Sequence, residues 1–207
     1  MNKIDYLKHI VSKLTEPNNE SIKMSLNNVH HNGLFSLVVD GNEFGKLLRI
    51  FIADVKLKPF EVQLHTHRYP IIITSIKGQI KQHIAYQVSD KEAESVNMNM
   101  YNYKSFLNGG KGLEYIYEST YKLNEFFIPN GSSIYMGTHE FHTISCTKGS
   151  IWIVEEKGFE REHSKVLGIP FVTDNLYQKP EMFQINDKIQ IVLRELKQII
   201  KDYESVL

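Results

Sequence analysis

The hydrophobic and polar positions of this chain follow a helical period at its two ends and a strand period between them. Apolar residues at 3.6-residue spacing predict a first helix that Pro17 ends, a second helix from about Asn19 to Asn32-Gly33, and a final helix that Asp187 opens. The positions that carry these periods are Ile4, Leu7, Ile10, Val11 and Leu14; Ile22, Leu26 and Val29; and Ile189, Val192, Leu193, Leu196, Ile199, Ile200 and Tyr203.

The middle of the chain reads as a series of short strands separated by glycine-containing turns. Strands that follow one another without intervening helices favour an antiparallel barrel or sandwich over an α/β fold. We expect a loop over residues 89–97 and irregular structure over residues 159–180. The predicted strands are Leu34–Asp40, Lys46–Val55, Phe60–Thr66, Ile71–Ile76, Gln79–Val88, Met98–Phe106, Leu113–Leu123, Phe126–Pro129, Ser133–Met136, His142–Cys146 and Ile151–Glu155.

These elements predict one structural domain. Residues 1–33 form a helical part that packs on the barrel, residues 34–180 form the barrel, and residues 181–207 form the C-terminal helix. The apolar stripe of that helix needs covering, either by the outside of the sheet or by a partner subunit. The apolar face of Phe60, Val62 and Leu64 needs a cover too, and we therefore expect a homodimer.

Composition narrows the function classes. The 207 residues carry 23% charged side chains and a formal net charge of +0, which gives no reason to expect nucleic acid or an anionic membrane as a partner. Neither a signal peptide nor a membrane-spanning run is apparent. The single cysteine, Cys146, excludes an internal disulfide, is expected to be buried, and fits a cytoplasmic protein.

The chain is organised around His65 and His67. Two residues two apart on an extended strand point the same way, so both imidazoles share one face with Glu61 and Gln63. The opposite face is largely apolar. A strand that is apolar on one side and carries histidines on the other resembles the wall of a pocket, and converging neutral imidazoles are good ligands for a divalent metal.

Two segments resemble the motifs of the cupin superfamily. His65-Thr66-His67 followed by Gly78 is similar to the first motif, but Pro59 stands at its opening glycine, and Ile71 or Ile72 stands at its glutamate. Gly131 to His142 is similar to the second motif, in which His142 falls on the histidine. There the chain departs from the motif at three positions: Gly137 replaces the proline, His139 the second glycine, and Cys146 the asparagine.

The resemblance implies a jelly-roll β-barrel with one divalent metal ion bound by His65, His67 and His142. Because isoleucine replaces the motif glutamate, the site resembles the three-histidine subset, of which thiol dioxygenases are the best known. Iron(II) is the favoured ion, with zinc, manganese and nickel as alternatives. Three protein ligands leave coordination positions open, which is typical of a catalytic site.

Other residues are weaker candidates for the same site. His139 is a candidate for a fourth or an alternative ligand, or for a base beside the site, and Gln63 and His83 are candidates for contacting substrate. Because thiol dioxygenases bind the substrate carboxylate with an arginine, the resemblance makes Arg49 a candidate for that role, whereas strand alternation places Arg68 off the histidine face. Five tyrosines are candidates for the mouth of a pocket: Tyr86, Tyr101, Tyr103, Tyr115 and Tyr117.

The resemblance implies a mononuclear metal-dependent dioxygenase that acts on a small polar molecule, such as a thiol or an amino-acid derivative. Two alternatives stay open. One is a metal-dependent isomerase or lyase, in which the ion polarises an oxygen atom of the substrate. The other is a barrel that binds a small molecule without catalysis.

Overall fold

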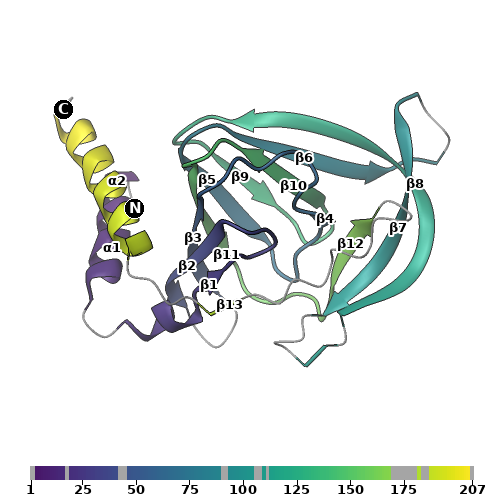
Figure 1. Ribbon diagram of the computed structural model, residues 1–207, viewed down its shortest axis with the longest axis horizontal. Coiled ribbons are helices and arrows are strands. Elements are labelled where there is room, and N and C mark those ends of the chain that lie inside the picture. Colours follow the sequence, from purple (N-terminus) through teal and green to yellow (C-terminus); the bar gives the residue numbers. More distant parts are fainter. Residues whose placement is uncertain are drawn as a thin grey trace.

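In the part of the chain that the structure describes, the protein is mainly β, with two α-helices packed on the outer face of one of two antiparallel sheets (Figure 1). The computed structural model describes residues 3–16, 19–41, 46–89, 93–104, 109–110, 112–168, 181–182 and 187–205. The helices are α1 (Lys3–Thr15) and α2 (Asp187–Glu204), with a short 3-10 helix, η1 (Glu20–Met24), after α1. Both predicted terminal helices are therefore confirmed.

The first sheet has the strand order β13-β1-β2-β3-β11-β5-β9, and every neighbouring pair is antiparallel. One face of this sheet carries the helices and the other faces the second sheet (Figure 1). Its strands are β1 (Leu26–Asn27), β2 (Leu34–Gly41), β3 (Leu47–Ala53), β5 (Ile71–Lys77), β9 (Ser133–Met136), β11 (Ile151–Glu156) and β13 (Glu181–Met182).

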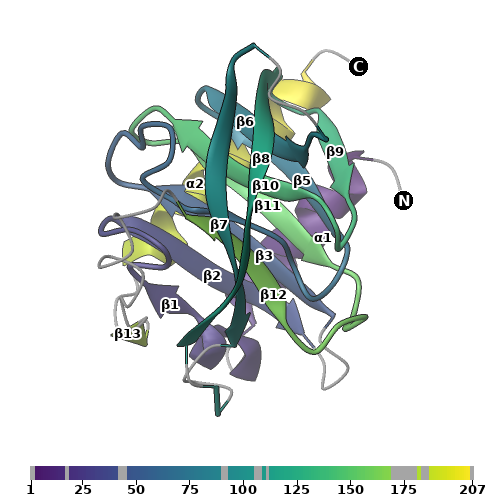
Figure 2. The same ribbon diagram turned by 90° about the vertical axis from the view of Figure 1, so that its right-hand side faces the viewer.

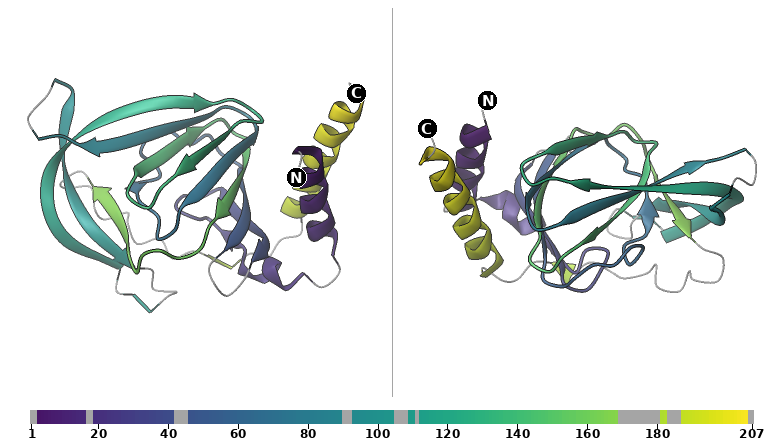
Figure 3. Two further views of the ribbon diagram at one scale, coloured as in Figure 1. Left: turned by 180° about the vertical axis from the view of Figure 1, so that it is seen from behind. Right: turned by 90° about the horizontal axis from the view of Figure 1, so that it is seen from above.

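The second sheet closes on itself in the order β10-β4-β12-β7-β8-β6. Strands β7 and β8 are long and lie at the end of the molecule far from the helices, as Figures 2 and 3 show. The strands of this sheet are β4 (Leu64–His65), β6 (Ile80–Gln87), β7 (Ser95–Lys104), β8 (Gly112–Ile128), β10 (Phe141–Cys146) and β12 (Ser164–Gly168).

Strand alternation sorts the apolar side chains of the first sheet into two layers. In β3, Ile50 and Ile52 pack with the helices, while Phe51 and Ala53 belong to the core between the sheets. The stripe of α2 from Ile189 to Ile200 is buried against α1 and this sheet. The chain thus covers the stripe that suggested a partner subunit, and the homodimer stays a prediction.

The predicted helix from about Asn19 to Asn32-Gly33 is wrong beyond its first turns. Only Glu20–Met24 is helical, and Leu26–Asn27 instead pairs with β2 on one side and β13 on the other. The apolar residues at helical spacing serve the sheet here, because backbone pairing to two strands outweighs a weak local helical preference. The segment thus ends as a strand followed by a turn into β2.

The predicted strand Phe60–Thr66 is mostly wrong as well. Only Leu64–His65 is strand, and Phe60 has a φ of 67°, a left-handed conformation that breaks an extended run. Val62 and Leu64 are buried as the apolar alternation predicts, whereas Phe60 is exposed.

Further differences concern the far end of the barrel. Residues 164–168, expected to be irregular, form β12 between β4 and β7. The predicted strands Leu113–Leu123 and Phe126–Pro129 are merged in β8, and β7 begins at Ser95, inside the predicted loop. The predicted glycine turn between these strands lies partly outside the described residues. The rest of the predicted irregular stretch, residues 169–180, lies wholly outside them.

Candidate metal centre

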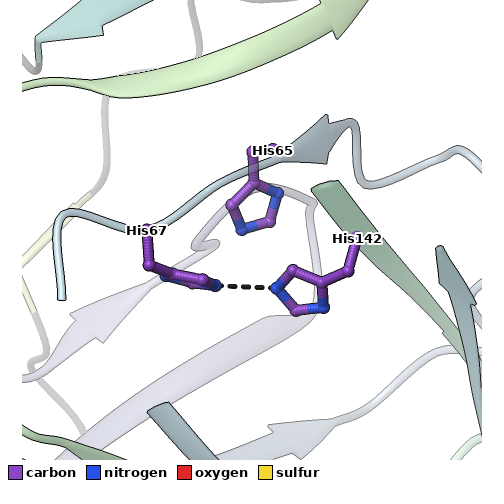
Figure 4. Close-up of side chains that lie close together, drawn as sticks. All are labelled: His65, His67 and His142. Carbon is purple, nitrogen blue, oxygen red and sulfur yellow. Dashed lines mark hydrogen bonds between the residues drawn. The ribbon is translucent and has the colours of Figure 1, made fainter. Parts of the chain in front are cut away.

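The pairing of β4 with β10 brings the histidines together. His65 and His142 are direct partners in the antiparallel register, so their side chains leave the sheet on the same face. His67 follows two residues later and turns toward the same point (Figure 4). The three ring centroids form a nearly equilateral triangle, with separations of 4.9 Å for His65–His67, 5.0 Å for His65–His142 and 4.9 Å for His67–His142.

One nitrogen from each ring lies within 4.8 Å of the others, in a cluster that fits a metal ion. His142 is buried, and His65 and His67 are half-buried. Burial is the main cause that lowers the pKa of each of the three imidazoles, and mutual repulsion lowers the pKa of His67 and His142 further. The rings are therefore neutral near pH 7, which is the state that binds metal.

Hydrogen bonds fix which nitrogen faces the centre. Nδ1 of His65 lies 2.7 Å from the backbone carbonyl of Gln63, and Nδ1 of His142 lies 2.9 Å from Oε1 of Gln82. Since these oxygens only accept, both Nδ1 atoms carry the proton and both Nε2 atoms keep a lone pair. A metal-binding histidine is usually oriented in this way, by a carbonyl or carboxylate at its other nitrogen.

Nε2 of His142 lies 2.7 Å from Nε2 of His67 (Figure 4). A single proton between the two nitrogens makes this contact a hydrogen bond in the metal-free protein. A divalent cation would take the place of that proton, held by the lone pairs of the imidazole nitrogens. The donor set of three neutral imidazoles, two of them with a fixed tautomer, thus fits a metal such as iron or zinc.

A buried carboxylate lies across the sheet from Ile71, one of the two residues that can stand at the motif's glutamate position. Ile71 is buried and pairs in register with Glu156, whose side chain is also buried. Nε of Arg49 lies 2.6 Å from Oε1 of Glu156, so this carboxylate is already paired. The ring of Tyr69 lies 5.8 Å from that of His67. Burial raises the pKa of the Tyr69 hydroxyl most, and the nearby Glu156 carboxylate raises it further.

A fourth histidine, His30, lies beside the cluster. Its ring stacks on His65 with centroids 5.0 Å apart and an interplanar angle of 26°. His30 was not predicted from the sequence, because the hydrophobic pattern assigns its segment to a helix and no motif marks it. Two observations could have drawn attention to it: the His30-His31 pair, and the Asn-Gly turn that follows.

The structure separates the other candidates from the centre. His139 is exposed in the turn before β10, where its ring contacts the guanidinium of Arg161. His83 faces away from His142, because its register partner is Thr143, and the two successive residues of β10 point to opposite faces. Its Nε2 lies 2.8 Å from Oγ of Ser145 and its Nδ1 lies 3.3 Å from Glu125.

Gln63 contacts the histidine cluster with its backbone, because its carbonyl oxygen accepts the hydrogen bond from Nδ1 of His65. Its side-chain Oε1 is buried without a hydrogen-bond partner among the described residues, and so is Nε2 of Gln82. Of the five tyrosines expected at a pocket mouth, Tyr86, Tyr115 and Tyr117 are exposed, and Tyr101 and Tyr103 are half-buried. Cys146 is buried as expected, which raises the pKa of its thiol to about 11.

Comparison with known proteins gives distant structural likenesses. No family model matches the chain, and no curated protein matches it. The chain is similar to hydroxypropylphosphonic acid epoxidase from S. wedmorenis, with 13% identity and a TM-score of 0.39 over 64% of this chain and 53% of that one. It is also similar to hydroquinone 1,2-dioxygenase from Sphingomonas sp. TTNP3, with 11% identity and a TM-score of 0.37 over 59% of this chain and 65% of that one.

The chain thus spans little more than half of the epoxidase and under two thirds of the dioxygenase. Because these likenesses are distant, a function for the protein has to be argued from the geometry of the histidine cluster. Within the described part of the chain, neither helix has the length and apolar character needed to cross a membrane.

Proposed function

We propose that the protein is a mononuclear metal-dependent oxygenase that acts on a small polar molecule, with the ion held by His65, His67 and His142. The observation that carries this proposal is the triangle of imidazoles with ring separations of 4.9 to 5.0 Å, two of them with Nε2 fixed as the free donor atom. Iron(II) is the favoured ion. When bound, it supplies open coordination positions and redox chemistry that protein side chains lack.

The charges around the centre favour a substrate with an anionic group. Arg49 is balanced by Glu156, and the three imidazoles are neutral. A divalent ion in this setting keeps its full charge, which an anionic group of the substrate would balance. The salt bridge with Glu156 makes Arg49 a weaker candidate for that role than the ion itself.

Two buried amides support a role in orienting the substrate. Nε2 of Gln82 is a donor and Oε1 of Gln63 is an acceptor, and neither has a partner among the described residues. Leaving such groups unpaired costs about 1–3 kcal/mol each. Gln82 shares the inner face with His142, since its register partner on β10 is Ile144. The two glutamines would thus offer one donor and one acceptor to a polar ligand beside the histidines.

The test begins with the metal. Protein loaded anaerobically with ferrous ion is exposed to nitric oxide, which reports an open position on iron by its electron paramagnetic resonance signal. Oxygen uptake is then measured with a panel of small anionic thiols, amino-acid derivatives and phenols. The proposal predicts uptake with at least one compound, lost in His142→Ala. Conversion without oxygen uptake would instead indicate an isomerase or lyase, and a metal-independent ligand shift in Tm would indicate a binding protein.

A further inference from the structure

His30 stands on a turn whose backbone is fixed from three sides. The turn joins β1 to β2 and is closed by a hydrogen bond of 2.8 Å from the Val29 amide to the Leu34 carbonyl. Oδ1 of Asn28 accepts from the Gly33 amide at 3.0 Å. The Gly33 carbonyl accepts from the Asp54 amide at 2.8 Å, which ties the turn to the end of β3. The position of the His30 backbone therefore depends on the sheet, not on the side chain of His30.

The backbone of His30 has a left-handed conformation, with a φ of 64°, and Asn28 has one too, with a φ of 52°. Side chains other than glycine seldom adopt this conformation, and asparagine tolerates it better than most. Such residues persist where the surrounding structure holds them, and they concentrate at functional sites. Glycine would suit position 30 better if the backbone alone mattered. The imidazole at this position calls for a reason of its own.

The ring of His30 is placed at the same spacing as the rings of the triad. It lies 5.0 Å from the ring of His65, the same separation as between His65 and His142. His30 is exposed as a residue, and its ring lies stacked on that of His65 at the edge of the cluster.

We propose that His30 is a fourth imidazole ligand, which rotates onto the metal ion when the ion is bound by the triad. The inference rests on the proposed metal site. In this proposal His30, on the turn between β1 and β2, takes the role of fourth ligand that the glutamate has in the motif. The resulting site is made of neutral nitrogen ligands, and Glu156 stays paired with Arg49.

The neighbouring His31 offers a matched control. It carries the same side chain, but its Nδ1 lies 2.7 Å from the Asn32 carbonyl and its Nε2 lies 3.9 Å from a carboxylate oxygen of Glu61. It has no ring contact with the triad among the described residues. Removing His31 should therefore leave the coordination of the ion unchanged.

The experiment uses cobalt(II), whose visible absorption depends on the number and kind of its ligands. Full-length wild type, His30→Gly and His31→Gly are titrated with cobalt(II), and affinity is measured by competition with a chelating dye. Glycine is chosen at position 30 because it accepts the left-handed backbone and keeps the turn. Each titration is repeated with added imidazole, which can occupy the space that the removed ring leaves.

We expect His30→Gly to bind cobalt(II) at least about tenfold more weakly than wild type, with an altered spectrum that added imidazole restores. His31→Gly should match wild type in both respects. Equal affinity and spectrum in His30→Gly and wild type would overturn the inference while leaving the triad intact. An altered spectrum that imidazole fails to restore would also overturn it, because it would indicate a purely structural role. Absence of binding in wild type would overturn the proposed function together with this inference.

Discussion

Gln82 accepts a hydrogen bond from Nδ1 of His142 at 2.9 Å, and both side chains project into the interior from neighbouring strands. The bond sets the tautomer of His142 and points its Nε2 toward His67. The orientation of the His142 ring thus depends on an amide that the sequence motifs do not mark.

Replacing Gln82 should weaken metal binding without removing a ligand. In Gln82→Leu, His142 loses the hydrogen bond that fixes the tautomer and the orientation of its ring. We therefore expect metal affinity to fall about 10–100-fold. Gln82→Glu keeps an acceptor and should retain most of the affinity. Gln87→Leu, at the exposed end of the same strand, is the control. Titration with a metal-sensitive dye measures all three, and unchanged affinity in Gln82→Leu would remove this glutamine from the account.

The pair of Arg49 and Glu156 should matter for stability through its burial. Arg49→Met leaves the Glu156 carboxylate buried without its cation, and we expect the free energy of unfolding to fall by about 3 kcal/mol. The double variant Arg49→Met/Glu156→Leu should recover most of this loss, since no charge is left unpaired. Lys8→Met, which breaks an exposed pair with Glu204, should leave stability unchanged. Urea denaturation gives these values, and equal loss in the single and double variants would argue against the explanation.

Cys146 should be unreactive in the folded protein. Burial raises the pKa of its thiol to about 11, so about one thiol in a thousand is ionised at pH 8. Because the thiolate is the reactive form, alkylation by iodoacetamide should be negligible at pH 8, rise as the pH approaches 11, and be complete in urea. Mass spectrometry follows the modification. Rapid labelling of the folded protein at pH 8 would show that this strand opens readily.

Much of the barrel was predictable because alternation is a strong local signal. The runs that form β2, β3, β5, β6, β10 and β11 are apolar on one or both faces, and short glycine turns separate most of them. Strands such as β1 and β12 were missed because they are short and exist through pairing with distant partners. Phe60 was placed in a strand because its left-handed backbone leaves no trace in the hydrophobic pattern.

The candidate site divides in the same way. His65 and His67 are two apart in the sequence, and the spacing from Gly131 selects His142, so motif and parity suffice to name them. Gln82 reaches His142 only through the register of β6 with β10, which the sequence leaves undetermined. His30 comes near His65 through a turn whose backbone is set by β2 and β3. Residues that depend on such long-range register need the structure.

The central claim is that His65, His67 and His142 hold one metal ion, and metal content tests it most directly. Wild type and the variants His65→Ala, His67→Ala, His142→Ala and His139→Ala are loaded with ferrous ion under anaerobic conditions, desalted and submitted to elemental analysis side by side. The account predicts one ion per chain in wild type and in His139→Ala, whose ring lies outside the cluster, and sharply reduced occupancy in the other three variants. Full metal content in all three ligand variants, or loss of the ion in His139→Ala but not in His142→Ala, would contradict it.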